Sequence, residues 1–279
     1  MYLLDRLEIH AVDHCNLACV GCNHNSPFLK KREYTAEDYI PWIERIKAKD
    51  VRINKLCITG GEAFLHRDLC PFVGKLKEAA EPGLTEIFSN CYWLTDEQSI
   101  DKHDCLLRTV NRLHYSLYKP IVDKIGLDEM NRLLGIIKDR YPNLHVTTFV
   151  DGINKTFGLV AFYDEPVERL AHQTCQVKTC TQLRADGKLY RCPQGLALEG
   201  HPGMSEGFKA SQDIVYDLAG DDDRDFHQFL AKWPLDACAY CSCGLARETP
   251  IPWTSDPKIR GMGPEEYKNR LVQIVFRGV

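Results

Sequence analysis

The stretch from Leu7 to Cys22, LEIHAVDHCNLACVGC, joins an expected β-strand to a group of three cysteines. Its first six residues, Leu7–Val12, have the apolar character of a strand. Three thiols follow within eight residues, at Cys15, Cys19 and Cys22. Three thiolates can hold three irons of a 4Fe–4S cluster and leave the fourth iron open to a small chelating molecule. A zinc site completed by His14 or His24 is the alternative, although this spacing is unusual for zinc.

Downstream of this stretch, short apolar runs alternate with helical patterns as far as residue 150. We expect further strands at Lys55–Thr59, Thr85–Ser89, Arg112–Leu117 and His145–Val150. Helices are expected at Thr35–Lys49, Cys70–Ala80, Thr95–Val110 and Ile121–Tyr141, with Thr35 and Thr95 as N-caps. This alternation predicts an α/β fold of parallel strands joined by crossovers. Five such units, or six if one more follows, are too few for a closed eight-stranded barrel. We therefore expect a partial (β/α)6 open barrel that binds ligands at the carboxyl ends of its strands.

The C-terminal part of the chain has a different pattern. Leu183–Tyr190 predicts a hairpin around Asp186–Gly187. Six cysteines lie between Cys175 and Cys243, which indicates a second metal site. We expect a core domain over residues 1–170, a small module of a β-hairpin plus a helix over 171–250, and a tail over 251–279 that packs on the core.

Composition narrows the class of protein. The 279 residues carry a net charge of −4, so a nucleic acid is not an expected partner. Neither a membrane-crossing run nor a signal peptide is visible, so we expect a cytoplasmic protein without a membrane partner. Thirteen cysteines, an odd number, argue against a disulfide framework in such a compartment. The four scattered ones, Cys57, Cys70, Cys91 and Cys105, are expected to be small buried residues.

The cysteine trio and the run Thr59-Gly60-Gly61-Glu62 together resemble the radical S-adenosylmethionine superfamily. The resemblance implies S-adenosylmethionine as cofactor, with the glycine backbone contacting its methionyl ammonium and Glu62 balancing the charge. It also implies cofactor contacts from Ser89, Asn90 and Ser116. The residue before the third cysteine is usually aromatic in the family, but here it is Gly21. The adenine contact is thereby left to Phe28, Tyr92 or His24.

The C-terminal cysteines resemble the twitch extension of this superfamily, a short SPASM-type domain that holds one auxiliary 4Fe–4S cluster. This resemblance implies the ligands Cys175, Cys192, Cys238 and Cys241, with Cys180 as a rival for the first position. Two 4Fe–4S clusters per chain are therefore expected. A structural zinc site formed by the same cysteines is the alternative.

The resemblance implies reductive cleavage of S-adenosylmethionine and abstraction of a hydrogen atom by a 5′-deoxyadenosyl radical. A flavodoxin- or ferredoxin-type protein is the expected electron donor. The run Asn25-Ser26-Pro27 resembles enzymes that modify carbohydrates, so we expect a sugar-like small molecule as substrate. Hydroxyl-binding candidates are His114, Tyr118, Asp151, Asn154, Arg184 and Gln194.

Several outcomes of this chemistry stay open. Epimerisation, with Cys243 or Cys180 as the hydrogen-atom donor, stands slightly ahead of dehydrogenation, in which the auxiliary cluster accepts an electron. Modification of a ribosomal peptide is a further alternative. A non-catalytic iron–sulfur electron carrier is the alternative from another class, and the glycine pair with Glu62 argues against it.

Overall fold

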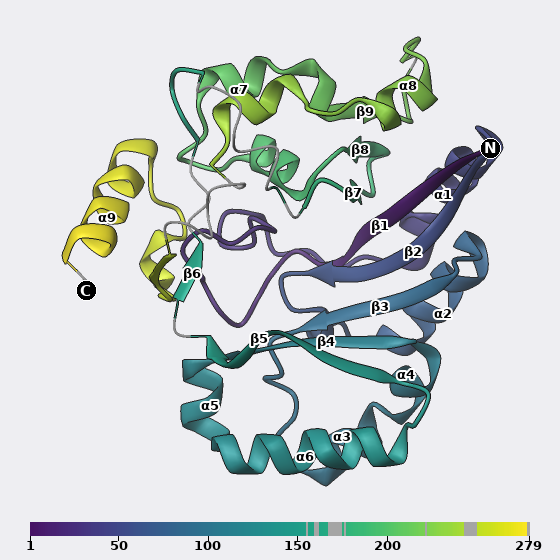
Figure 1. Ribbon diagram of the computed structural model, residues 1–279, viewed down its shortest axis with the longest axis vertical. Helices are drawn as coiled ribbons and strands as arrows, with labels where there is room; N and C mark the ends of the chain where they lie inside the picture. The colour runs from purple at the N-terminus through teal and green to yellow at the C-terminus, as the bar shows by residue number, and fades with distance from the viewer. Residues whose placement is uncertain are drawn as a thin grey trace. The chain divides into compact units, whose positions relative to one another are not determined.

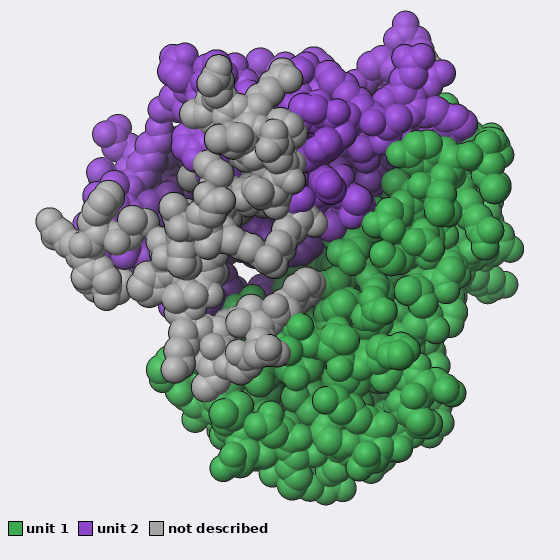
Figure 2. Space-filling model, viewed as in Figure 1, with its two compact units in different colours: residues 1–12, 32–155 green, residues 13–31, 156–279 purple. Residues whose placement is uncertain are grey.

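The computed structural model describes residues 1–154, 156–158, 162–166, 175, 177–220, 222–242 and 250–277. The chain divides into two compact units, coloured separately in Figure 2. Unit 1 contains residues 1–12 and 32–155, and unit 2 contains residues 13–31 and 156–279. The cysteine trio therefore belongs to unit 2, whereas the run Gly60-Gly61-Glu62 belongs to unit 1. The domain limits expected from the sequence remain predictions.

Among its described residues, unit 1 contains five parallel strands in the order β5-β4-β3-β2-β1 (Figure 1). They are β1 (Tyr2–Val12), β2 (Val51–Gly60), β3 (Leu84–Ser89), β4 (Arg112–Tyr118) and β5 (His145–Asn154). Each expected strand is present, and neighbours in sequence are neighbours in the sheet. The predicted α/β fold with an open sheet is confirmed.

One face of this sheet is apolar because the strands align their apolar residues in register. Ile9 pairs with Ile58, Ile58 with Ile87, and Ile87 with Leu113. All four side chains are fully buried. Alternation along each strand sends the neighbouring residues to the opposite face.

The helices of unit 1 are α1 (Ile40–Ala48), α2 (Leu69–Ala80), α3 (Glu97–Lys102), α4 (Asp104–Thr109), α5 (Lys119–Ile125) and α6 (Leu127–Arg140). Two expected single helices are each broken in two. The helix expected at Ile121–Tyr141 breaks at Gly126, whose φ of 92° interrupts the helical backbone. The helix expected from Thr95 breaks at His103, and its cap is Asp96, whose carboxylate accepts the Ser99 N–H at 2.8 Å. Thr35 caps the short 3-10 turn Ala36–Asp38 that precedes α1.

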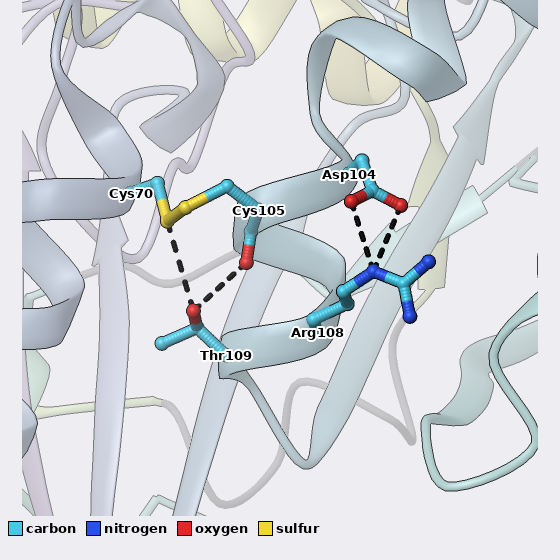
Figure 3. Close-up of a disulfide and its surroundings, with 5 residues drawn as sticks. All are labelled: Cys70, Asp104, Cys105, Arg108 and Thr109. Atoms are coloured by element: carbon cyan, nitrogen blue, oxygen red, sulfur yellow. Dashed lines mark hydrogen bonds and ion pairs between the residues drawn. A yellow bond between two sulfur atoms is a disulfide. The ribbon is translucent and has the colours of Figure 1, made fainter.

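The expectation for the four scattered cysteines is half right. Cys57 and Cys91 are fully buried, as predicted. Cys70 and Cys105 instead form a disulfide that joins α2 to α4 (Figure 3). The Thr109 hydroxyl lies beside this bond and donates to the Cys105 carbonyl at 2.8 Å. The pairing was not predicted because 35 residues separate the two cysteines, and only the packing of the two helices brings them together.

Unit 2 contains the expected hairpin. Strands β7 (Cys180–Leu183) and β8 (Lys188–Tyr190) pair antiparallel, and β9 (Val215–Asp217) extends them. Gly187, with a φ of 86°, forms the turn. A second pair is formed by β6 (Thr156–Gly158) and β10 (Pro250–Pro252).

The described part of unit 2 also contains helical segments. They are η3 (Pro193–Glu199), α7 (Glu206–Ala210), η4 (Gln212–Ile214), α8 (Phe226–Ala231), η5 (Asp236–Tyr240), η7 (Pro257–Ile259) and α9 (Pro264–Arg277). One apolar cluster centres on Phe208 and Leu235. Another joins Val20 and Phe28 of the cysteine loop to Ile259 and Tyr267 of the tail. No helix in the described part of either unit is long and apolar enough to cross a membrane.

Candidate functional site

The cysteine loop, residues 13–31, begins directly after β1 and carries the trio. The Cys15 thiol accepts the Leu17 N–H at 3.3 Å. Cys19 forms an isolated antiparallel bridge with Ser255. The Cys22 carbonyl accepts the Asn25 N–H at 3.0 Å, where Asn25 adopts a left-handed φ of 57°. The loop therefore contains tight turns at Cys15 and Cys22 and a backbone bridge at Cys19.

The electrostatics of the trio fit a shared cation. Burial raises the pKa of Cys19 well above its usual value, and the charges of Cys22 and Cys15 raise it further. Burial also raises the pKa of Cys22, while N–H groups of Ser26, His24 and Asn25 oppose that rise. Buried thiolates that repel one another become stable when a metal neutralises them. Their chemistry suits iron with sulfide.

The trio is not arranged as a finished metal cage. Within the described ranges, no three His, Cys, Asp or Glu side chains converge as ligands of a single metal ion. Cys22 and Cys15 are close enough to Cys19 to raise its pKa, and the ligand assignment remains the prediction made from the sequence.

Residues from the C-terminal tail hold the cysteine loop within unit 2. The Arg260 guanidinium donates to the carbonyls of Cys15 and Leu17, each at 3.0 Å. The Ser255 hydroxyl accepts the Ala18 N–H at 2.8 Å. The tail was expected to pack on the core, but these particular contacts were not predicted, because no local pattern connects positions about 240 residues apart.

A buried ion network joins the start of the loop to the hairpin. Arg184 donates to both carboxylate oxygens of Asp13, at 2.9 and 3.0 Å. Its remaining N–H groups contact both oxygens of Glu199, also at 2.9 and 3.0 Å. Arg184 and Asp13 are 5% and 3% exposed. Arg184 was expected to bind substrate hydroxyls, but its guanidinium is occupied by two carboxylates of its own chain.

The end of β2 in unit 1 explains why Gly60 must be glycine. Its φ is 126°, and a Cβ there would lie 2.1 Å from the Val12 carbonyl oxygen. The next residue, Gly61, donates its N–H to the same oxygen at 2.9 Å. The glycines therefore let the ends of β1 and β2 approach each other closely. This reason is distinct from the cofactor contact that the sequence resemblance implies.

Glu62 connects the loop after β2 to the loop after β3. Its Oε1 accepts the Ser89 hydroxyl at 2.9 Å and the Phe64 N–H at 3.2 Å. Its Oε2 accepts the Asn90 N–H at 2.7 Å. The side chain is 2% exposed, and burial raises its pKa to about 7 against the effect of these donors. Three of the six expected cofactor-contacting residues, Glu62, Ser89 and Asn90, thus form one bonded group.

The hydroxyl of Ser89 is fully used inside this group. Besides donating to Glu62, it accepts the Cys91 N–H at 2.9 Å and the Trp93 indole N–H at 3.2 Å. Ser116 lies in β4 at the point where the register with β5 shifts, between Tyr115 and Leu117. It stands apart from the Glu62 group.

A polar row on the second face of the sheet was missed. Glu8, Cys57, Glu86 and Arg112 pair in register across β1 to β4. The fully buried Glu86 accepts from Arg112 at 2.6 Å and from the Cys57 thiol at 3.3 Å. Burial opposes its ionisation, but hydrogen bonds from His114 and Cys57 lower the pKa of Glu86 to about 2. The signal was the alternation of Arg6, Glu8 and His10 with apolar residues along β1.

The second cysteine group lies in unit 2. Cys192, Cys238 and Cys241 border the same apolar cluster around Phe208 and Leu235. Cys180 lies in β7 and is 3% exposed. Cys175 is described as a single residue between undescribed neighbours, and Cys243 lies outside the described residues. Three of the four predicted auxiliary ligands thus share one region.

The three adenine-contact candidates have different surroundings. Phe28 packs edge-on against His201 and Tyr267, with centroids 4.8 and 5.2 Å away. Tyr92, in unit 1, donates its hydroxyl to the Phe64 carbonyl at 3.2 Å. His24 lies in the turn beside Cys22. None of these contacts selects one candidate.

Comparison with known proteins relates the chain to a group of cyclases. No family model matches it. The GTP 3′,8-cyclase of Nautilia profundicola is 30% identical over 159 residues, which cover 55% of this chain and 50% of that protein. A GTP 3′,8-cyclase from a Cyanothece species is 29% identical over 128 residues, covering 45% and 39%. The matches thus span half or less of these relatives' own lengths. They support the radical S-adenosylmethionine superfamily indicated by the cysteine trio and the Gly-Gly-Glu run.

A crystal structure of BtrN in complex with AdoMet and 2-DOIA aligns with 86% of this chain and 94% of its own, at 13% identity and a TM-score of 0.49. A crystal structure of Streptococcus suis SuiB bound to S-adenosylmethionine aligns with 84% and 67%, at 14% identity and a TM-score of 0.38.

Proposed function

We propose that this chain is a radical S-adenosylmethionine enzyme that abstracts a hydrogen atom from a carbohydrate-type small molecule. The observation that carries the proposal is the cysteine loop, in which Cys22 and Cys15 are near enough to Cys19 to raise its pKa, as expected for three thiols that could share a metal. When bound, a 4Fe–4S cluster and S-adenosylmethionine supply one-electron cleavage of the sulfonium and a 5′-deoxyadenosyl radical.

Glu62 is proposed to hold the ammonium of the cofactor. A carboxylate has about four acceptor positions, and three hydrogen bonds leave one on Oε2. The donors from Phe64, Ser89 and Asn90 fix the direction of the carboxylate before any ligand arrives. A cation at the remaining position would lower the pKa of Glu62 from about 7, so binding releases a proton below that pH.

For the fate of the substrate radical, we propose epimerisation ahead of dehydrogenation. Epimerisation needs a protonated thiol as hydrogen-atom donor, and Cys180 or Cys243 is the proposed group. Of the two, Cys180 lies among the described residues, in β7 at 3% exposure.

Cyclisation of a nucleoside triphosphate is the second candidate reaction, and the names of the sequence relatives favour it. Such a substrate needs cationic side chains for its phosphates. The guanidiniums of Arg184 and Arg112 already contact carboxylates of this chain. These two arginines are therefore not the ones that we propose for a phosphate.

The enzyme proposal is tested by reconstituting the protein anaerobically, reducing it with dithionite and quantifying 5′-deoxyadenosine. Wild type should release it from S-adenosylmethionine, and a variant with Cys15, Cys19 and Cys22 all changed to Ala should not. The matched control is the double variant Cys70→Ser with Cys105→Ser, which removes two cysteines outside the loop and should retain release. A wild-type protein with intact clusters and no release is an electron carrier.

The auxiliary cluster is tested by metal analysis of the same preparation. About eight irons per chain are expected for two cubane clusters. About four irons with one zinc would identify the C-terminal site as structural zinc.

Epimerisation is separated from dehydrogenation in deuterated water. An exchangeable thiol donor places one deuterium on carbon in a product of unchanged oxidation state. A product two hydrogens lighter identifies dehydrogenation.

A further inference from the structure

Unit 2 contains a pocket beside the third cysteine of the trio. Its lining includes Gly21, Cys22 and Asn25 of the cysteine loop, together with Phe162, Gln194 of η3, and His201. The hollow measures about 240 Å³ to its open mouth. Its enclosed part is only large enough for a group the size of a water molecule.

Asn25 supplies an acceptor without a partner. Its Nδ2 donates to the Leu196 carbonyl at 3.1 Å, and a carbonyl can only accept, so this contact fixes which end of the amide is oxygen. Oδ1 is buried and has no hydrogen-bond partner among the described residues. The residue is 2% exposed, so a hydrogen-bond donor entering the pocket would satisfy a group that otherwise carries a desolvation penalty.

His201, which lines the same pocket, supplies a hydrogen-bond donor. Its Nδ1 accepts the Gly203 N–H at 3.0 Å, which assigns the ring proton to Nε2. Burial lowers the pKa of His201 to about 4, so the ring is neutral at physiological pH. Phe162 contacts this ring edge-on at 5.4 Å and adds an apolar surface.

The chemistry of the walls selects the ligand. An oriented acceptor and an oriented donor match a hydroxyl, which donates and accepts at once. None of the described lining residues is Lys, Arg, Asp or Glu, so nothing in this part of the chain would neutralise a phosphate or carboxylate. An adenine ring is too large for the enclosed part.

We propose that this pocket is a subsite for one hydroxyl of a neutral polyhydroxylated substrate, which donates to Asn25 Oδ1 and accepts from His201 Nε2. The inference rests on the proposed function for the role of that molecule as substrate. It deepens that function by placing a hydroxyl of the substrate beside Cys22.

Two histidine variants separate binding from a purely structural role. His201→Asn keeps an acceptor near the Nδ1 position but has no donor at the Nε2 position. His201→Gln keeps a donor near the Nε2 position but has no acceptor at the Nδ1 position. Calorimetric titration of myo-inositol, glycerol and methyl glucoside into the reconstituted protein with S-adenosylmethionine measures the effect. At least one polyol should bind wild type, with Kd about tenfold weaker for His201→Asn, as expected for one lost hydrogen bond of about 1.4 kcal/mol. His201→Gln should remain within about threefold of wild type.

A variant of Asn25, the other polar residue of the proposed subsite, gives an independent measurement. Asn25→Gly suits the left-handed backbone and removes Oδ1, so it should also weaken polyol binding, whereas Asn143→Gly at an exposed position should not. Loss of binding in His201→Gln with retention in His201→Asn would overturn the proposal, because only the contact with Gly203 would then matter. Absence of binding by all three polyols would also overturn it and would mean that the pocket holds water only.

The same wild-type preparation is assayed for 5′-deoxyadenosine. Release without polyol binding rejects the subsite and leaves the proposed function standing. Polyol binding without release of 5′-deoxyadenosine rejects the proposed function and leaves the hydroxyl-binding subsite standing.

Discussion

Unit 1 and the cysteine loop of unit 2 keep their shape by different means. In unit 1, Ile58 and its neighbours in register bury an apolar row that alternation along the strands produces. In the cysteine loop, contacts come from positions far away in sequence: Arg184 to Asp13, Asn25 to Leu196, and Arg260 to Cys15. The scaffold of this protein is therefore stabilised by local periodicity, and its proposed reactive loop by long-range polar contacts.

The largest effect is expected when the ion network is broken. Arg184→Met leaves the buried carboxylate of Asp13 without a cation and also removes the partner of Glu199, which should lower the free energy of unfolding by about 3 to 5 kcal/mol. Urea denaturation measures this loss, and hydrogen exchange should show it first in residues 13–31. The surface variant Arg132→Gln removes ion pairs of an exposed arginine and serves as control. Equal stability of the Arg184 and Arg132 variants would refute the role of the network.

Removing apolar volume from the scaffold should have a somewhat smaller effect at a different place. Ile58→Ala leaves a cavity in the fully buried row and should cost about 2 to 5 kcal/mol. Hydrogen exchange should accelerate in β1 to β4, with residues 13–31 protected as in wild type. Faster exchange in the cysteine loop alone would contradict the distinction between the two regions. The exposed Val272→Ala is the control.

Glu62 gives unit 1 a pH dependence. Because burial raises its pKa from 4.5 to about 7, the folded chain keeps a proton that the unfolded chain releases between these values. Stability should therefore fall as the pH rises through this window, by about 3 kcal/mol in total. Urea midpoints at pH 5 and pH 8 measure the difference. Glu62→Gln should reduce this dependence, and Glu78→Gln on the exposed side of α2 should leave it unchanged.

The smallest effect is expected at a local cap. The Asp38 carboxylate accepts from the Thr35 N–H at 2.8 Å and from its hydroxyl at 3.0 Å. Asp38→Ala should cost about 1 kcal/mol, measured by thermal unfolding. A loss as large as that of Ile58→Ala would mean that a local contact matters as much as the buried row.

Much of the scaffold was predictable because its signals are short-range. Apolar runs flanked by helical patterns located the five parallel strands β1 to β5 of unit 1, and Asp186–Gly187 located the hairpin. The interruptions of helices were harder to predict than the helices themselves. Gly126, for example, was expected to lie within one long helix, but it ends one helix and begins the next. The Cys70–Cys105 bond was missed for another reason, since burial and pairing of a cysteine look alike in sequence.

The candidate site was predictable as a set of residue types but not as a set of contacts. The trio and the Gly-Gly-Glu run are visible because their chemistry needs fixed local spacing. The partners of Glu62 come from the loop after the next strand, and those of Asp13 from a hairpin about 170 residues away. Many other acidic and basic residues offered equally good pairings in sequence.

The sequence by itself determined the alternation of strands and helices, the cysteine loop after the first strand, and the glycines after the second. These features depend on periodicity and on spacing within a few residues. Only the tertiary structure decided that Arg184 is an internal anchor, that two scattered cysteines pair, and that Asn25 and His201 face one pocket. Those outcomes depend on which distant groups share a buried environment, where an unpaired charge or amide is unfavourable and the partner must come from the fold.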